Sequence, residues 1–387
     1  MLRGSATLCT VFSRRSSRDQ SPNAIARSLA ARARPRWDLT ISNPTAAGIT
    51  YPEELLPALE RSQSGALAYR PAAFGDMAAR EALSVLTSAD PRDILLTAST
   101  SEAYSFLFKL LCDPGDAVLV PAPSYPLLEH LAELEGIRAL PYRLAYDGAW
   151  HVDLDSVRRA LDVGARAIVV VSPNNPTGQY LLPAERRALE SFGLPLISDE
   201  VFGAFPLEAP APAPMTEPAT LTFTLDGLSK RAGLPQLKLA WTVVSGPLEQ
   251  RQRARERLEL IADTFLSVGA QVQRALPEIL PLCPLLTQRI AARCRENWHT
   301  LEQLVAASAL TRLRADAGWS AVLRLPRLAS EETIVLDLLE RHDVLVQPGW
   351  FYDFESEPYL VVSLLSEPST FQEGCRRLVA YATELTR

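Results

Sequence analysis

The segment Ala165-Arg-Ala-Ile-Val-Val-Val-Ser-Pro-Asn-Asn-Pro-Thr-Gly178 joins an apolar run to a proline-rich loop. The run at 167–171 shows no alternation of apolar and polar residues, which predicts a strand buried on both faces of a parallel sheet. The prolines and Gly178 then predict a turn that ends the strand. Asn175 would therefore lie at the carboxyl end of a central strand, where open α/β sheets bind their ligands.

Six further short β-branched runs alternate with helical patterns on both sides of this segment. The remaining strand candidates are 93–98, 117–121, 138–143, 195–199, 220–225 and 237–245, and the helices are expected near 75–88, 101–112, 125–135, 153–163 and 183–192. Such alternation is typical of a parallel sheet with helices on its faces. The sequence therefore predicts an α/β fold with a mostly parallel, seven-stranded sheet flanked by helices.

The pattern changes after residue 246. Long helices are expected near 247–275 and 286–308, followed by strands near 319–325 and 359–365 and a final helix near 369–384. We expect an N-terminal arm at 1–50, a large domain at 51–275 and a small α+β domain at 276–387 that packs with the arm. The proline-rich stretch 209–218 is predicted to be a loop, because proline removes donors and fixes φ.

Composition limits the classes of function. The 387 residues carry a formal charge of −6 and no run of five basic residues, which argues against nucleic-acid and membrane-surface binding and favours small-molecule partners. No apolar run reaches the roughly 18 residues that cross a bilayer. Five scattered cysteines and four histidines without ligand spacing predict no disulfide framework and no metal site. We therefore expect a soluble, cytoplasmic protein.

The first 37 residues contain eight arginines and a single acidic residue, Asp19. This composition is compatible with an organellar targeting segment. Residues 24–34 also have the pattern of an amphipathic arm that leads into the fold, and arginine is abundant throughout the chain. Both interpretations remain open.

Three polar groups lie at or after the carboxyl ends of predicted strands: the carboxylate of Asp199 ends one, and the amide of Asn175 and the amine of Lys230 follow two others. Together they suit pyridoxal phosphate, whose aldehyde binds a lysine amine, whose pyridine nitrogen needs an anion and whose phenolic oxygen needs a hydrogen-bond donor. Each residue also has a simpler interpretation. Asn175 fits an ordinary turn, Asp199 a helix N-cap, and Lys230 an exposed loop.

The chain contains only three lysines, so the candidates for a covalent bond are few. Lys109 repeats at four-residue spacing with Ser101 and Ser105, which predicts the solvated face of a helix and a surface charge. Lys230 directly follows a predicted strand and is the expected nucleophile. Lys238 follows it by eight residues.

A phosphate site is predicted where the helix after residue 99 begins. Free backbone amides and the positive end of a helix dipole attract anions, and the hydroxyls of Thr100 and Ser101 would add hydrogen bonds. Tyr125, just past another strand, is positioned to stack on a planar ring. An ordinary helix start and a core aromatic are the alternatives.

With these motifs, residues 38–385 resemble the class I/II aminotransferases, the aspartate-aminotransferase-like enzymes of pyridoxal phosphate fold type I. The resemblance assigns cofactor-binding roles to Tyr69, Thr100, Ser101, Tyr125, Asn175, Asp199, Ser229 and Lys230. It implies that Lys230 binds the cofactor covalently and moves the proton, while Asp199 pairs with the pyridine nitrogen. It also implies a homodimer, because the tyrosine matching Tyr69 reaches the partner's phosphate site.

Four positions depart from the family pattern. Phe202 stands in place of a tyrosine that donates to the phenolic oxygen, and Gly227 in place of a phosphate-binding serine. Lys238 stands in place of a phosphate-binding arginine and supplies charge without the bidentate fork. Val361 stands near the position of the arginine that holds the substrate carboxylate. Asn43, Arg324 and Trp350 are the remaining candidates for substrate contacts.

The first functional hypothesis is an aminotransferase that moves an amino group between an amino acid, or a related amine, and a 2-oxo acid by a ping-pong mechanism, in amino-acid metabolism and biosynthesis. A lyase or decarboxylase that uses the same cofactor is the alternative among enzymes. A non-catalytic regulator of this fold is the third hypothesis, motivated by the four departures.

Overall fold

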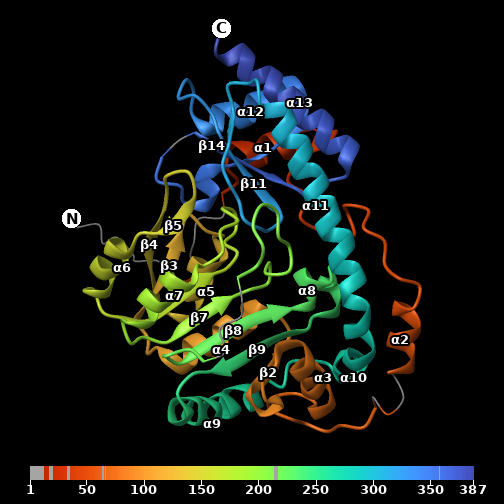
Figure 1. The fold of residues 1–387 in the computed structure, drawn as a ribbon, viewed down its shortest axis with the longest axis vertical. Helices are drawn as coiled ribbons and strands as arrows, with labels where there is room; N and C mark the ends of the chain where they lie inside the picture. The colour runs from red at the N-terminus through yellow and green to blue at the C-terminus, as the bar shows by residue number, and fades with distance from the viewer. Residues whose placement is uncertain are drawn as a thin grey trace, which may run out of the picture.

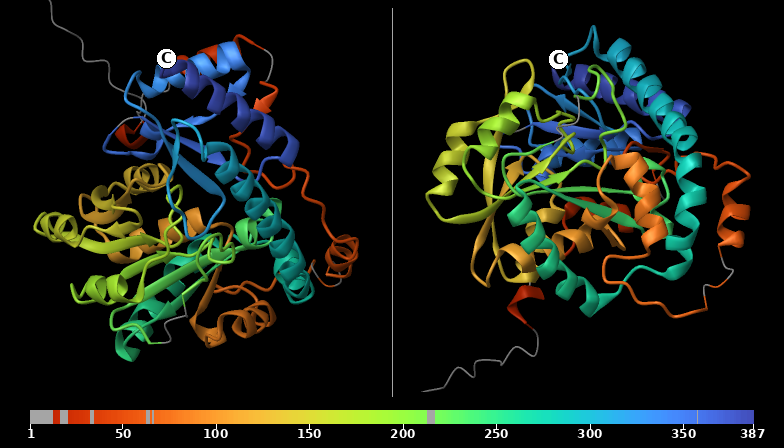
Figure 2. Two further views of the ribbon diagram at one scale, coloured as in Figure 1. Left: turned by 45° about the horizontal axis from the view of Figure 1, so that its top comes forward. Right: turned by 60° about the horizontal axis from the view of Figure 1, so that its bottom comes forward.

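The computed structural model describes residues 13–16, 21–32, 35–62, 65, 67–212, 217–356 and 358–387. Figure 1 shows a large sheet with helices on both faces and a smaller domain above it that contains the C-terminus. Both views in Figure 2 show the blue C-terminal elements stacked on the green and yellow strands. The predicted α/β fold with a second α+β unit is confirmed.

The large sheet has eight strands in the order β2-β9-β8-β7-β6-β3-β4-β5. Their bounds are β2 Ile94–Thr97, β3 Ala117–Ala122, β4 Arg138–Tyr146, β5 Trp150–Val152, β6 Ala165–Val171, β7 Leu196–Asp199, β8 Thr222–Gly227 and β9 Ala240–Ser245. Only β9 and β5 run antiparallel to their neighbours. All seven predicted strands form, and β5 is an eighth that the sequence analysis missed, because three residues in a hairpin with β4 are too short to show a period.

Helices cover both faces of this sheet. They are α3 Met77–Thr87, α4 Thr100–Leu111, α5 Leu127–Glu135, α6 Leu154–Leu161, α7 Pro183–Glu190, α9 Leu248–Phe265 and α10 Ala270–Ile279. Ala167 and Val169 of β6 pack with α4, α5 and α9, whereas Ile168 and Val170 pack with α6 and α7. The predicted burial of this strand on both faces is therefore confirmed.

The prediction of one helix over 247–275 is wrong. Leu266 takes a left-handed conformation with φ of 44°, and the chain continues through Ser267 to Gly269 before α10 begins. The left-handed residue ends α9, because the next amide can no longer continue the helical hydrogen-bond pattern. Two helices separated by a short loop result, and the loop lies close to Tyr69.

The small domain contains the sheet β10-β11-β14-β13. Its strands are β10 Thr311–Arg312, β11 Ser320–Arg324, β13 Gln347–Pro348 and β14 Tyr359–Ser363, and its helices are α11 Cys283–Val305, α12 Glu331–His342 and α13 Pro368–Leu385. The N-terminal arm packs here: α1 Ala24–Ala30 contacts α12, and β1 Trp37–Asp38 pairs with β12 Val344–Leu345. Within the arginine-rich first 37 residues, positions 1–12, 17–20, 33 and 34 lie outside the described residues.

Helix α11 belongs to both domains. Leu286 near its start packs with Leu228 and Trp241 in the large domain, whereas Ile290 and Trp298 pack in the core of the small domain. Figure 1 shows α11 running along one side of both units. One continuous helix thus links the two hydrophobic cores.

A buried carboxylate joins three elements of the small domain. Glu331, at the start of α12, accepts hydrogen bonds from the amides of Trp350 and Tyr359, each at 2.6 Å. Trp350 lies in the short helix η5 Gly349–Tyr352, and Tyr359 begins β14. Gly349 is required here, because a Cβ atom would lie 2.7 Å from the Glu331 Oε1 atom.

We predict that Glu331→Ala destabilises the protein by roughly 2–5 kcal/mol, because two backbone amides lose the buried carboxylate that accepts from them. The midpoint of denaturant unfolding measures the loss. Glu332→Ala, one residue further along and exposed, is the matched control and should change stability by less than about 0.5 kcal/mol. Equal effects of the two substitutions would contradict the assigned role of Glu331.

Candidate active site

The carboxyl ends of three neighbouring strands bring the predicted groups to one edge of the sheet. Val171 of β6 pairs in register with Asp199 of β7, which pairs with Leu225 of β8. Asn175 lies in the loop four residues beyond Val171, and Lys230 lies on the one-turn helix α8 Leu228–Arg231 directly after β8. The amide, the carboxylate and the amine therefore come from adjacent strands.

Asp199 is buried, and its carboxylate is held by two donors. The hydroxyl of Tyr104 donates to Oδ2 at 3.1 Å, and the amide of Val201 donates to Oδ1 at 3.2 Å. Burial raises the pKa of Asp199 to about 6, although both hydrogen bonds act to lower it. Turns rather than a helix follow the residue, so the structure does not support the helix N-cap interpretation.

Tyr104 was not among the site residues predicted from the sequence. The residue lies on α4, one helical turn after Thr100, and its side chain is 3% exposed. Contact with Asp199 raises the pKa of Tyr104 further, after burial has made the larger contribution. The four-residue spacing from Thr100 was the available signal, because residues i and i+4 share one face of a helix.

Lys230 lies within electrostatic range of this carboxylate. Burial lowers the pKa of its amine, and the negative charge of Asp199 opposes that shift. Helix α8 is fixed by a buried ion pair, in which Arg231 donates through Nε and Nη2 to the Asp226 Oδ2 atom at 2.6 and 2.5 Å. Since Asp226 is the penultimate residue of β8 and Arg231 follows Lys230 directly, this pair holds the turn that carries the lysine.

The two asparagines of the loop after β6 differ in their surroundings. Asn174 is buried, and its amide donates to the Pro123 carbonyl at 3.0 Å and to Thr177 Oγ1 at 2.9 Å. Asn175 is only half-buried, and its carbonyl accepts a hydrogen bond from Ser320 Oγ at 3.3 Å. Ser320 thereby orients the amide, and the Asn175 NH₂ group is the one available to a ligand.

The start of α4 has the features of an anion site. The Ser99 hydroxyl caps the helix by accepting from the Glu102 amide at 3.2 Å, and Glu102 Oε2 accepts from the Ala98 amide at 2.7 Å. The amides of Thr100 and Ser101 lie in the first helical turn, where no intrahelical acceptor exists. These amides and hydroxyls fit a phosphate group.

The neighbouring strand β9 explains one departure from the family pattern, the glycine at position 227. A Cβ atom at Gly227 would lie 2.9 Å from the Ala240 Cβ atom, so a serine does not fit at that position. Lys238 lies outside β9 in a left-handed conformation with φ of 50°, and its side chain is exposed.

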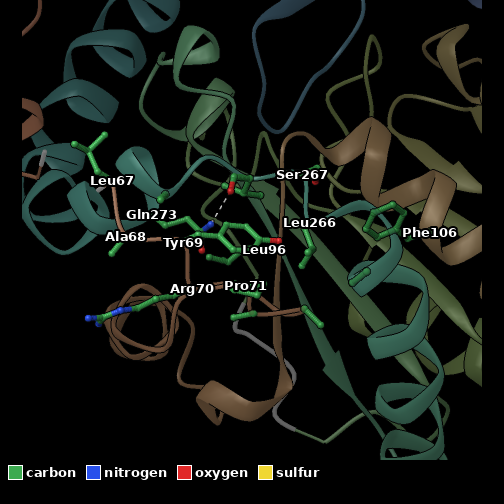
Figure 3. Close-up of a pocket in the computed structure, with 16 residues that line it drawn as sticks. Leu67, Ala68, Tyr69, Arg70, Pro71, Leu96, Phe106, Leu266, Ser267 and Gln273 are labelled. Atoms are coloured by element: carbon green, nitrogen blue, oxygen red, sulfur yellow. Dashed lines mark hydrogen bonds between the residues drawn. The ribbon is translucent and has the colours of Figure 1, made fainter. Parts of the chain in front are cut away.

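Two aromatic candidates lie on the surface of the single chain. Tyr125 follows β3 and is 46% exposed, so a planar ligand can reach its ring. Tyr69 is 81% exposed and lines a cavity with Leu266, Val268 and Gln273 (Figure 3). That cavity includes none of the residues on the loops of Asn175, Asp199 and Lys230, so the single chain does not bring Tyr69 to them.

The candidates for substrate contacts are only partly brought together. Arg324 is exposed at the opposite end of β11 from Ser320, and four residues of strand span about 13 Å. Val361 is 1% exposed and packs with Leu313, Val322 and Tyr352. Asn43 is exposed, with its side chain capping the Thr45 amide at 3.0 Å, and Trp350 is 37% exposed on η5.

Other features of the described residues bear on the sequence predictions. Glu200, next to Asp199, is half-buried and accepts a hydrogen bond from Ser198 Oγ at 2.9 Å. Lys109 pairs with Glu135 at 2.6 Å on the outer face of α4. Within the described ranges, no group of histidine, cysteine and acidic side chains could hold a metal ion, and no helix is long and apolar enough to cross a membrane.

The fold and this strand-edge site are those of an aminotransferase that uses pyridoxal phosphate. Residues 37–378 match the family "Aminotransferase class I and II", and the chain belongs to that family. The chain is 26% identical over 374 residues to the glutamate-pyruvate aminotransferase AlaA of Haemophilus influenzae, covering 89% of this chain and 90% of the relative. An alanine aminotransferase of Mycobacterium bovis is 26% identical, with 83% and 80% covered.

Solved structures agree in fold. A mutant aspartate aminotransferase of Thermus thermophilus superposes with a TM-score of 0.82 at 21% identity, covering 98% of this chain and all of that one. The tyrosine aminotransferase of Leishmania infantum gives a TM-score of 0.82 at 20% identity, with 95% and 99% covered. The expected family, cofactor and class of enzyme are therefore confirmed.

The buried Asp199 should destabilise the cofactor-free protein. Its pKa is about 6 in the folded chain against an ordinary 3.8, so the folded state binds more protons between these values and stability falls as the pH rises through them. We predict that Asp199→Asn stabilises the cofactor-free protein by about 2–3 kcal/mol at pH 8 and by little at pH 4. Thermal unfolding across this pH range measures the difference.

Asp226→Asn is the matched control, because it removes a buried carboxylate that already has a cationic partner. We expect it to destabilise the protein at pH 8 by breaking the ion pair with Arg231. A loss of stability in Asp199→Asn at pH 8 would show that burial of Asp199 is not the dominant effect.

Tyr104→Phe removes a donor from Asp199 and should raise the pKa of that carboxyl above about 6. We expect about tenfold weaker binding of pyridoxal phosphate at pH 7, with recovery at pH 9, where Asp199 is again ionised. Absorbance titration of the cofactor-free protein measures the dissociation constant. Tyr142→Phe removes a buried hydroxyl bonded to the Val169 carbonyl at 3.0 Å. This variant should leave the dissociation constants at pH 7 and at pH 9 unchanged.

Proposed function

We propose that this aminotransferase transfers the amino group of an amino acid to a 2-oxo acid by a ping-pong mechanism, with Lys230 as the covalent attachment point of pyridoxal phosphate and as the residue that moves the proton. The observation that carries the proposal is the convergence of Lys230, Asp199 and Asn175 at one strand edge. When bound, the cofactor supplies an electron sink that makes the α-proton of the substrate labile.

Each residue has a separate task in this proposal. Asp199, oriented by Tyr104, holds a positive charge at the pyridine nitrogen, and Asn175, oriented by Ser320, donates to the phenolic oxygen. The start of α4 and Lys238 bind the phosphate, and Tyr125 stacks on the ring. Phe202 has no hydroxyl, so Asn175 is the donor to the phenolic oxygen among these residues.

The burial that lowers the pKa of Lys230 suits proton transfer. A lysine with its ordinary pKa is almost fully protonated near neutral pH and cannot accept a proton, whereas a lowered pKa gives a larger neutral fraction. Without the cofactor, the negative charge of Asp199 opposes this lowering of the Lys230 pKa. Lys230 is therefore suited to take a proton from the substrate and to return it to a second carbon.

We also propose that the enzyme is a cytoplasmic homodimer with shared active sites. Tyr69 and Leu67 are 81% and 100% exposed beside the cavity of Figure 3, which is more than expected for large apolar side chains on a free surface. A second chain packed there would cover both side chains, and Tyr69 would be available to the partner's phosphate. The relatives named as alanine and glutamate-pyruvate aminotransferases make alanine, glutamate and their 2-oxo acids the first substrates to test.

We predict that borohydride reduction of the purified protein fixes the cofactor on Lys230, as seen by peptide mass spectrometry. Lys109 and Lys238 are the only other lysines and serve as internal controls. Lys230→Ala should lose the visible band and at least about 1,000-fold of the half-reaction rate with any amino donor. An adduct on Lys109 or Lys238, or a yellow protein without any half-reaction, would contradict the proposal.

A further inference from the structure

The amine of Lys230 lies beside a pair of aromatic rings that contact each other. Its Nζ atom is 5.2 Å from the centroid of the Trp319 ring and 5.7 Å from that of Phe202. The two rings meet edge to face, with centroids 5.4 Å apart at 71°, and Phe205 packs against the other side of the contact at 5.1 Å from Trp319. Both distances are within the roughly 6 Å at which a cation is attracted to a ring face.

The rings come from different domains and are held firmly. Phe202 lies in the turn after β7 of the large domain, and Trp319 directly precedes β11 of the small domain. The amide of Leu364 donates to the Trp319 carbonyl at 2.7 Å, and the amide of Gly318 donates to the Phe205 carbonyl at 2.9 Å. Trp319 is 3% exposed, so its ring has little freedom to move away from the lysine.

The buried amine has few other means of carrying a charge. Among the described residues, no hydrogen bond or ion pair to the Lys230 amine is found. Asp199 of β7 acts on it through space, while Asp226 of β8 is neutralised by Arg231 and Tyr104 of α4 is bonded to Asp199. The π faces of Trp319 and Phe202 are therefore the groups in direct reach of an ammonium at this place.

We propose that Trp319, together with Phe202, holds the ammonium of Lys230 whenever that amine is not covalently bound to the cofactor. Trp319 is in this sense a positioning residue: it acts through Lys230 and keeps the amine beside the reacting carbon rather than in solvent. The inference rests on the covalent role of Lys230 proposed above. It also assigns a role to Phe202, whose ring presents an apolar face without a hydroxyl next to the amine.

The test is a titration of single lysines in the full-length protein whose cofactor carries the amino group, so that Lys230 is free. Brief acetylation at a series of pH values, followed by peptide mass spectrometry, gives a labelling midpoint and a plateau rate for Lys109, Lys230 and Lys238 separately. Loss of a ring that stabilises the ammonium lowers the midpoint, whereas greater access raises only the plateau. The two effects are thus separable without any measurement of activity.

In Trp319→Leu we expect the Lys230 midpoint to fall by about 0.5–1.5 pH units, equivalent to roughly 3- to 30-fold more neutral amine at a given pH. Trp319→Phe, which keeps a ring face, should shift it less. Trp298→Leu is the matched control, because Trp298 is also buried and stacks on a cation, Arg312, at 3.8 Å, but lies in the core of the small domain. The midpoints of Lys109 and Lys238 should not move in any variant.

An unchanged Lys230 midpoint in Trp319→Leu, or an equal shift in Trp298→Leu, would overturn the inference. If Trp319→Leu does not fold, Phe202→Leu applies the same test from the large domain, and an unchanged midpoint there is equally decisive. Failure of Lys230 to take up the cofactor at all would instead refute the proposed function. The reduction experiment above therefore distinguishes the two failures.

Discussion

The burial of one carboxylate, that of Asp199, determines how the site is built. A carboxylate in such an environment is unfavourable unless a cation or several donors face it, and its raised pKa is the sign of that cost. Tyr104 and Val201 supply two hydrogen bonds, and the amine of Lys230, on α8 after the next strand, feels the charge of this carboxylate. The part of the burial cost of Asp199 that these groups do not offset suits a ligand with a positive charge on a flat ring. A protonated pyridine is such a ligand.

Parallel strand order is what makes this arrangement possible. The order β8-β7-β6 places three consecutive carboxyl ends side by side, although the residues that follow them are separated by tens of positions along the chain. The small domain completes the site from above: Ser320 orients Asn175, and Trp319 faces Lys230. A chemical centre is thus divided between two hydrophobic cores that α11 connects.

The sequence was sufficient for the parts that follow local rules. Continuous apolar runs predicted the seven longer strands, and the groups after three of them predicted Asn175, Asp199 and Lys230 as neighbours. The parts that depend on contacts between distant segments were not predictable in this way. Tyr104 and Trp319 meet Asp199 and Lys230 only after folding, and the short strand β5 and the break after Leu266 depend on hairpin pairing and on one left-handed residue.

The loop that carries Asn175 has a second consequence, which concerns motion. The amide of Ala317 donates to the Gly178 carbonyl at 2.8 Å, and a Cβ atom at Gly178 would lie 2.5 Å from the Ala317 carbonyl oxygen. The two backbones therefore touch with no side chain between them, two residues before Trp319. Any rotation of one domain against the other that preserves this contact must pivot about it, so the groups next to it, Asn175 and Trp319, would travel least.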